Sequence, residues 1–179
     1  DDAEAPWLAP TRQLISRTVR AGTPFLGICL GHQLATVALG GQVCTSDHFC
    51  LGAAEMHLTP EGKKDPLLSV YDGHRGIHFN NDVAVVLPED AVLLARDPTG
   101  QIEAVRFAER AWGVQFHPEC TPEIFDAWTI GHGEKEWQQR LPWSEAVTVA
   151  ETVRRDIDTV NAEEAFAARF QELIDPEKR

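Results

Sequence analysis

Basic residues, cysteines and long apolar runs are all scarce in this 179-residue chain. Sixteen lysines and arginines stand against 28 aspartates and glutamates, which gives a formal net charge of −12. Nucleic acids and anionic membranes bind basic surfaces, so this balance argues against nonspecific binding to either of them. Four cysteines are too few for a disulfide scaffold in a chain of this length, which favours a reducing, cytoplasmic compartment.

Neither a membrane-spanning helix nor a signal peptide is expected. The most apolar long stretch, Pro24 to Gly41, is interrupted by His32 and Gln33, whereas a spanning helix needs about 20 predominantly apolar residues. The chain begins Asp1-Asp2-Ala3-Glu4, without the basic and apolar regions of a leader. Because the first residue is not methionine and a helix approach follows at once, we expect residues upstream of Asp1 to be missing from this sequence.

The remaining pattern is typical of a mixed α/β fold. The predicted helices are Thr11–Arg20, Gly31–Leu39, Thr121–Ile130 and two within Ser144–Ile174 that break near Asp158–Asn161. The predicted strands are Phe25–Cys29, Glu55–Thr59, Gly76–Phe79, Val83–Leu87, Ala91–Ala95, Ile102–Phe107 and Trp112–Phe116. No repeat or linker divides the chain, so we expect one domain over residues 1–179 with a C-terminal helical extension at about 144–174.

A cysteine stands between two glycines at a predicted strand-to-helix turn, in the run Gly27-Ile28-Cys29-Leu30-Gly31. A nucleophile on such a turn has strained backbone angles, and glycines remove Cβ atoms that would crowd it. The following helix directs free N–H groups at the sulfur, which favours the reactive thiolate, and the amide of Leu30 is the obvious oxyanion donor. A buried cysteine that only fills a strand–helix corner is the alternative interpretation.

A thiol nucleophile needs a base, and the base needs a group that orients it. His117-Pro118-Glu119 follows the apolar strand Trp112–Phe116, and ligand sites in α/β sheets gather at strand ends. The His117 ring and the Glu119 carboxylate can project near the same edge, where the carboxylate fixes the imidazole tautomer. Taken alone, the His117-Pro118-Glu119 motif could be a polar strand terminus. Taken together with Cys29, the motif favours a catalytic site.

Two segments resemble the class I glutamine amidotransferase family: Pro24-Phe25-Leu26-Gly27-Ile28-Cys29-Leu30-Gly31-His32-Gln33 and Gly113-Val114-Gln115-Phe116-His117-Pro118-Glu119. The likeness runs from Asp1 to about Trp128 and is to stand-alone members that are similar to the amidotransferase domain of GMP synthase. It implies a three-layer α/β/α, flavodoxin-like sheet with a β-rich insertion.

The resemblance also implies the residues of the site. The triad is Cys29, His117 and Glu119: the thiolate attacks the side-chain amide of glutamine, ammonia leaves, and water hydrolyses the γ-glutamyl thioester. The residues expected to bind substrate are Gly27, Leu30, Gly31, Gln33, Asn80 and Asn81. Neither a cofactor nor a metal is expected.

The chain departs from the family pattern in two places. Family members carry a first βα unit and a Gly-Gly loop that supplies a second oxyanion donor, and neither stands upstream of Asp1, so we expect an N-terminally truncated domain. The segment His78-Phe79-Asn80-Asn81-Asp82 stands where relatives have a His-x-His or Ser-His type loop that holds the α-amino and carboxylate groups of glutamine. Asn80 and Asn81 can still offer backbone carbonyls there.

Three functions stay open. The first is a glutamine amidotransferase-type hydrolase that releases ammonia for a separate acceptor or synthetase subunit, since the chain has no phosphate-binding glycine loop of the ATP-pyrophosphatase kind. The second is a γ-glutamyl hydrolase or peptidase with the same triad. The third is a catalytically degenerate amidotransferase-like subunit that serves in binding or regulation.

Two further groups of residues are interpreted without a catalytic role. Cys44, His48, Cys50 and His57 match no common zinc-site spacing, so we expect a loop with incidental thiols.

We expect His32 to pack its helix near the site and Cys120 to stand at a helix entry. Trp128, Trp137 and Trp143 could cover the site, but packing of the C-terminal helices is favoured.

Overall fold

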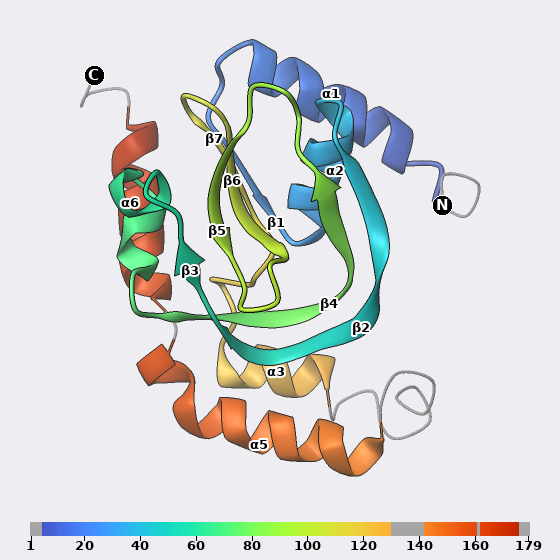
Figure 1. Ribbon diagram of the computed structural model, residues 1–179, viewed down its shortest axis with the longest axis vertical. Helices are drawn as coiled ribbons and strands as arrows, with labels where there is room; N and C mark the ends of the chain where they lie inside the picture. Colours follow the sequence, from blue (N-terminus) through green and yellow to red (C-terminus); the bar gives the residue numbers. More distant parts are fainter. Residues whose placement is uncertain (1–4, 130–141, 161, 176–179) are drawn as a thin grey trace.

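Figure 1 shows the computed structural model, which describes residues 5–129, 142–160 and 162–175. The helices are α1 (Leu8–Arg20), α2 (Leu30–Ala38), α3 (Pro122–Trp128), α5 (Trp143–Val160) and α6 (Glu163–Ile174), with 3₁₀ turns η1 (Gly62–Lys64) and η2 (Leu68–Tyr71). The strands are β1 (Phe25–Ile28), β2 (Gln42–Glu55), β3 (His57–Leu58), β4 (Arg75–Val86), β5 (Val92–Arg96), β6 (Ile102–Ala108) and β7 (Ala111–Val114). Within these residues, no helix combines the length and the apolar character needed to cross a membrane.

A five-stranded mixed sheet in the order β1-β7-β6-β5-β3 forms the centre of the fold. Strands β1 and β7 are parallel, with Ile28 beside Val114, whereas the other neighbouring pairs are antiparallel. Helices α1 and α2 cover one face of this sheet and α6 covers the other (Figure 1). The predicted three-layer α/β arrangement is confirmed.

Each face of the sheet has its own apolar core. On one face, Ile15 and Val19 of α1 are buried with residues of α2, β6 and β7. On the other face, Trp112 is buried with Tyr71 of η2 and Phe166 of α6. Because side chains alternate along a strand, β7 contributes to both cores and is covered on both sides. The position of its C-terminal end is therefore well defined.

Local signals set the helix ends as predicted. Gly22 has a φ of +69°, the left-handed conformation that glycine adopts readily, and follows Ala21, the C-cap residue of α1. At the start of α3, the Thr121 hydroxyl oxygen accepts a hydrogen bond from the Ile124 N–H at 3.3 Å, and Pro122 occupies the first turn. An accepting side chain at the N-cap satisfies one of the free amides of the helix.

The prediction of a loop around Cys44, His48 and Cys50 is wrong, and so is the prediction of separate strands at Gly76–Phe79 and Val83–Leu87. Both segments belong to long strands, β2 and β4, which form an antiparallel two-stranded sheet from Gln42↔Val86 to Glu55↔Arg75. The polar, glycine-containing sequence of β2 shows little alternation, and pairing with a distant strand satisfies its backbone hydrogen bonds. Asn80–Asp82 therefore has extended geometry.

The C-terminal segment forms two helices, as predicted, although α5 continues to Val160. Val153 and Ile157 of α5 are buried against Ile77 of β4 and Phe125 of α3. The helical extension thus packs against the same body as the two-stranded sheet (Figure 1). Part of the predictions falls outside the described residues: Ile130 as a helix end, the glycines at 131 and 133, Trp137 and Asn161.

Candidate active site

The parallel pairing of β1 and β7 brings Cys29 and His117 to the same edge of the sheet, since the carboxyl ends of parallel strands meet there. The Cys29 N–H donates to the Val114 carbonyl at 2.8 Å, and the His117 N–H donates to the Ile77 carbonyl at 2.8 Å. These bonds fix the backbone of both residues against neighbouring strands. The two motifs that carry the family resemblance therefore lie together.

Cys29 has the strained backbone that was predicted for a nucleophile elbow. Its φ is +46° and its ψ is −103°, and among the described residues it alone has a positive φ without being glycine. The first bond of the α2 ladder runs from the Gln33 N–H to the Cys29 carbonyl at 3.0 Å. The amides of Leu30 and Gly31 precede that ladder, so they are available to bind an oxyanion at the start of the helix.

The two glycines beside Cys29 have different surroundings. A Cβ on Gly27 would lie 2.6 Å from the carbonyl carbon and oxygen of Gly31 and 2.8 Å from the His32 nitrogen. A Cβ on Gly31 would meet nothing within 4 Å. Only Gly27 is therefore required for the close approach of β1 to α2, and the predicted crowding at Gly31 is wrong.

Gly27→Ala and Gly31→Ala form a matched pair that tests this difference. We expect Gly27→Ala to lower the free energy of unfolding by about 1–3 kcal/mol, because backbone atoms must move. Gly31→Ala lies in α2 and is expected to be neutral or to stabilise by up to about 1 kcal/mol, because alanine favours helix. Urea denaturation followed by circular dichroism measures both; equal losses would contradict the assignment.

The His117 ring is bound by a carboxylate. Its Nδ1 lies 2.7 Å from Oε1 of Glu119, and its side chain is 12% exposed. Burial alone would lower the pKa of His117, but hydrogen bonds and charge interactions with Cys29 and Glu119 outweigh burial and raise it to about 9. Since Glu119 takes Nδ1, Nε2 is the ring nitrogen left for Cys29. The ring is thus held protonated at neutral pH.

Trp128, at the end of α3, covers this histidine. The ring centroids of Trp128 and His117 are 4.5 Å apart, and the Phe79 ring of β4 lies 5.7 Å from that of Trp128. Trp128 also packs against the core that includes α5, as predicted. The structure therefore gives Trp128 both of the roles that the sequence left open.

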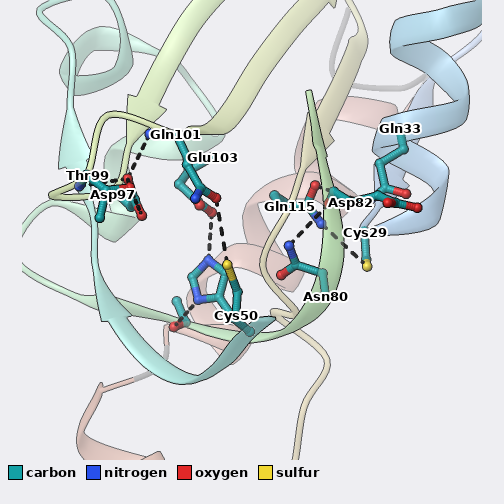
Figure 2. Close-up of polar contacts among 12 residues, drawn as sticks. Cys29, Gln33, Cys50, Asn80, Asp82, Asp97, Thr99, Gln101, Glu103 and Gln115 are labelled. Carbon is teal, nitrogen blue, oxygen red and sulfur yellow. Dashed lines mark hydrogen bonds and ion pairs between the residues drawn. The ribbon is translucent and has the colours of Figure 1, made fainter. Parts of the chain in front are cut away.

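A chain of side-chain amides reaches the Cys29 sulfur (Figure 2). Gln33 Nε2 donates to the Asp82 carbonyl at 2.8 Å and to Gln115 Oε1 at 3.2 Å, and Gln115 Nε2 donates to Cys29 Sγ at 3.5 Å. Gln33, predicted to contact substrate, is bound to protein groups here. Gln115 was not among the predicted site residues; its only signal was a polar residue within an apolar strand.

The predicted pair Asn80 and Asn81 points to opposite sides of β4. Asn80 is 6% exposed, and its Nδ2 donates to the Asp82 carbonyl at 3.2 Å. Its Oδ1 is buried and has no hydrogen-bond partner among the described residues. Asn81 is exposed. Of the two, Asn80 is therefore the one that faces the interior near Gln115 and Cys29 (Figure 2).

A second histidine–carboxylate pair is buried between β4 and β6. His78 Nε2 lies 2.7 Å from Glu103 Oε2, with side chains 4% and 2% exposed, and His78 Nδ1 lies 3.0 Å from the Gly76 carbonyl. Burial lowers the pKa of His78, but the charge and hydrogen bond of Glu103, with the Gly76 carbonyl, raise it above its ordinary value. The sequence analysis did not find this pair, because its members are 25 residues apart.

Cys50 and Cys120 are poor nucleophiles. Burial, together with nearby carboxylates, raises the pKa of Cys50 to about 11 and that of Cys120 to about 12, which keeps both as thiols. Cys44, His48 and Cys50 lie on β2 and His57 on β3. In the part of the chain that the structure describes, no three histidine, cysteine or acidic side chains are grouped to hold a metal ion.

His32 packs its helix, as predicted. It is fully buried, and its ring centroid lies 5.9 Å from that of Phe107 on β6. Burial lowers the pKa of His32 to about 4, so the ring is neutral at physiological pH. A buried, neutral ring packed against Phe107 leaves His117 as the candidate base.

Comparisons with known proteins agree with this geometry. The family model described as Glutamine amidotransferase class-I matches residues 4–131. The chain is 37% identical over 115 residues to a glutamine-hydrolyzing GMP synthase of Marinobacter nauticus, covering 56% of this chain and 20% of the relative. It is 34% identical over 101 residues to a subunit of the glutamine-hydrolyzing GMP synthase of Methanothermobacter thermautotrophicus, covering 54% and 51%.

The fold comparison extends further along the chain. A crystal structure of a glutamine amidotransferase from Thermotoga maritima superposes with a TM-score of 0.76 at 20% identity, covering 98% of this chain and 73% of that one. The chain spans between a fifth and about half of the length of the two curated relatives. The family match covers more than half of the chain and includes both motifs. The chain therefore belongs to the class I glutamine amidotransferase family.

Proposed function

We propose that this chain hydrolyses the side-chain amide of glutamine through a cysteinyl thioester and releases ammonia. One observation carries the proposal: Cys29 stands on a strained strand-to-helix turn beside His117, whose ring is held by Glu119 at 2.7 Å. Nucleophile, base and orienting group are the three parts that nucleophilic catalysis requires. The family match supports the same reaction class.

In the proposed first step, the Cys29 thiolate attacks the amide carbon of glutamine and forms a tetrahedral intermediate. The amides of Leu30 and Gly31 stabilise its oxyanion at the start of α2. The carbon–nitrogen bond then breaks, and protonated His117 gives its Nε2 proton to the leaving nitrogen, which departs as ammonia. Glu119 stabilises the imidazolium before that transfer.

In the proposed second step, water attacks the γ-glutamyl thioester. His117, now neutral, takes the proton of the water, the carbon–sulfur bond breaks, and glutamate leaves. The thiolate and the imidazolium are restored together. The raised pKa of His117 keeps its ring protonated at neutral pH in the resting enzyme.

We further propose a separate acceptor polypeptide for the ammonia. The relative from Methanothermobacter thermautotrophicus is named as one subunit of a glutamine-hydrolyzing GMP synthase, so that enzyme is divided among chains. The cytoplasmic location expected from the cysteine count stays a prediction. The γ-glutamyl hydrolase alternative uses the same triad, so the leaving group distinguishes it.

A glutamine-shaped diazoketone tests the proposal directly. We expect a single adduct on Cys29 in peptide mapping, and excess glutamine should prevent it. An adduct that glutamine does not prevent, but a γ-glutamyl amine does, would favour the hydrolase or peptidase. No adduct, combined with no ammonia release from glutamine, would contradict the proposed activity.

The pH dependence of the reaction follows from the pKa of His117. The ring is protonated below about pH 9 and loses its proton above that value, so kcat should fall as the pH rises through about 9. In Glu119→Gln one of the groups that raise this pKa is removed, and the falling limb should move to lower pH by about one unit. Initial ammonia release between pH 6 and 10 measures it; an unmoved limb would exclude Glu119 as the orienting carboxylate.

A further inference from the structure

A buried amide faces the Cys29 sulfur, and the mechanism above does not use it. Gln115 is fully buried, and its Nε2 donates to Cys29 Sγ at 3.5 Å. Gln115 and Phe116 directly follow β7; Phe116 belongs to the apolar core, whereas the Gln115 side chain reaches Gln33 and Cys29. An amide buried at this depth lowers stability unless its hydrogen bonds are made. The Cys29 sulfur thus accepts one of the hydrogen bonds that the buried Gln115 amide requires.

The hydrogen bonds of Gln33 determine which end of the Gln115 amide faces the sulfur. The Asp82 carbonyl can only accept, so the Gln33 group next to it at 2.8 Å must be the N–H₂ end. The second hydrogen of that N–H₂ group meets Gln115 at 3.2 Å, which must therefore present its oxygen. Gln115 is left with its N–H₂ end toward Cys29 (Figure 2). A backbone carbonyl of β4 thus fixes a donor at the sulfur.

We propose that Gln115 stabilises the Cys29 thiolate by an N–H···S hydrogen bond, and that Gln33 and the Asp82 carbonyl are positioning groups that hold Gln115 in the donating orientation. A donor that faces a charged acceptor contributes more than one that faces a neutral acceptor, so the bond favours the thiolate over the thiol. The inference rests on the proposed function, because it adds a residue to that site.

The assignment gives the amide nitrogen of Gln33 a role within the protein. Both hydrogens of its amide nitrogen are used within the protein, by Asp82 and Gln115. The residue predicted to contact glutamine thus serves the nucleophile in this structure. Its effect on the sulfur is indirect and should be weaker than that of Gln115.

Alkylation by iodoacetamide tests the proposal without glutamine. In Gln115→Met, which keeps the length of the side chain and removes the donor, we expect Cys29 to react about tenfold more slowly at the low-pH end of its pH–rate profile, where the thiolate is the minor form. The pH–rate profile should move to higher pH and should meet that of the unchanged protein at the high-pH plateau, where both proteins carry the thiolate. Peptide mapping reports Cys29 separately, with exposed Cys44 as the internal reference.

Gln101→Met is the matched control. Gln101 also contacts a thiol, but as the acceptor for Cys50 at 3.7 Å, so its replacement should leave the Cys29 profile unchanged. Gln33→Met removes the positioning bond alone and should give a smaller shift in the same direction. It also provides the test if circular dichroism shows that Gln115→Met does not fold.

Superimposed Cys29 profiles for the unchanged protein, Gln115→Met and Gln33→Met would overturn the proposal. The readout is independent of glutamine hydrolysis. A protein whose Cys29 profile shifts in Gln115→Met but which releases no ammonia from glutamine would retain this inference and lose the proposed function. The reverse result, ammonia release with an unmoved profile, would retain the function and remove Gln115 from it.

Discussion

Replacement of Cys29 by alanine is expected to abolish glutamine hydrolysis, with a loss of at least about 10⁴-fold in kcat. The sulfur is the atom that bonds to the substrate in the proposed reaction, and alanine has nothing to replace it. His117 and Glu119 cannot compensate, because they act on the proton and not on the carbonyl carbon. Ammonia release from glutamine, measured with a coupled dehydrogenase, gives the rate.

Cys44→Ala is the matched control for this experiment. Cys44 is an exposed thiol on β2 and has no part in the proposed reaction, so its replacement should leave ammonia release unchanged. His117→Asn keeps the thiol but removes the proton carrier, and we expect it to reduce kcat by about 10²–10⁴-fold. Undiminished turnover in Cys29→Ala would exclude the thioester mechanism.

The largest expected effect on stability is at the buried pair of His78 and Glu103. Replacement of Glu103 by leucine should lower the free energy of unfolding by about 3–5 kcal/mol near pH 6, because it leaves His78 buried without its counter-charge. Removal of both partners, in His78→Leu with Glu103→Leu, should recover much of this loss, since no unpaired charge remains. Urea denaturation of the three proteins measures the differences.

The pH dependence of that loss has a definite sign. Glu103 raises the pKa of His78 above its ordinary value of 6.5, so the stability from the pair is fully present below 6.5 and is lost as the pH rises through the raised pKa. Without Glu103, burial would lower the same pKa, and Glu103→Leu should lose stability as the pH falls through 6.5. The difference in the free energy of unfolding between the unchanged protein and Glu103→Leu should therefore be largest at low pH. An equal difference in the free energy of unfolding at pH 5.5 and pH 8.5 would contradict a charged pair of His78 and Glu103.

The catalytic motifs could be predicted because each is local. Gly27, Cys29 and the start of α2 lie within one short segment, where short-range preferences produce a strand, a tight turn and a helix. His117 and Glu119 are two residues apart at a strand end, so their contact needs no distant partner. That the two motifs share one site was expected from the gathering of ligand sites at strand ends and from the family resemblance, whereas the parallel pairing of β1 and β7 that brings them together is seen only in the structure.

The parts that were predicted wrongly or not at all depend on residues far apart in the chain. The segment that forms β2 was expected as a loop because its own sequence has little strand pattern. Pairing with β4 supplies its backbone hydrogen bonds. Gln115 and Cys29 are 86 residues apart, and His78 and Glu103 are 25 apart. No short-range signal marks such contacts.

From its own pattern, this sequence determined a mixed α/β fold, the elbow at Cys29 and the pair of His117 and Glu119, since these arise from neighbouring residues. The fold in three dimensions decided that Gln33 binds Gln115 instead of standing free, that Trp128 covers His117, and that Asn80 lies in an extended strand. Those outcomes depend on which strands pair and which faces pack. Strand pairing and burial stabilise contacts between segments that are far apart in the sequence. Which residues make those contacts is therefore decided only in the folded chain.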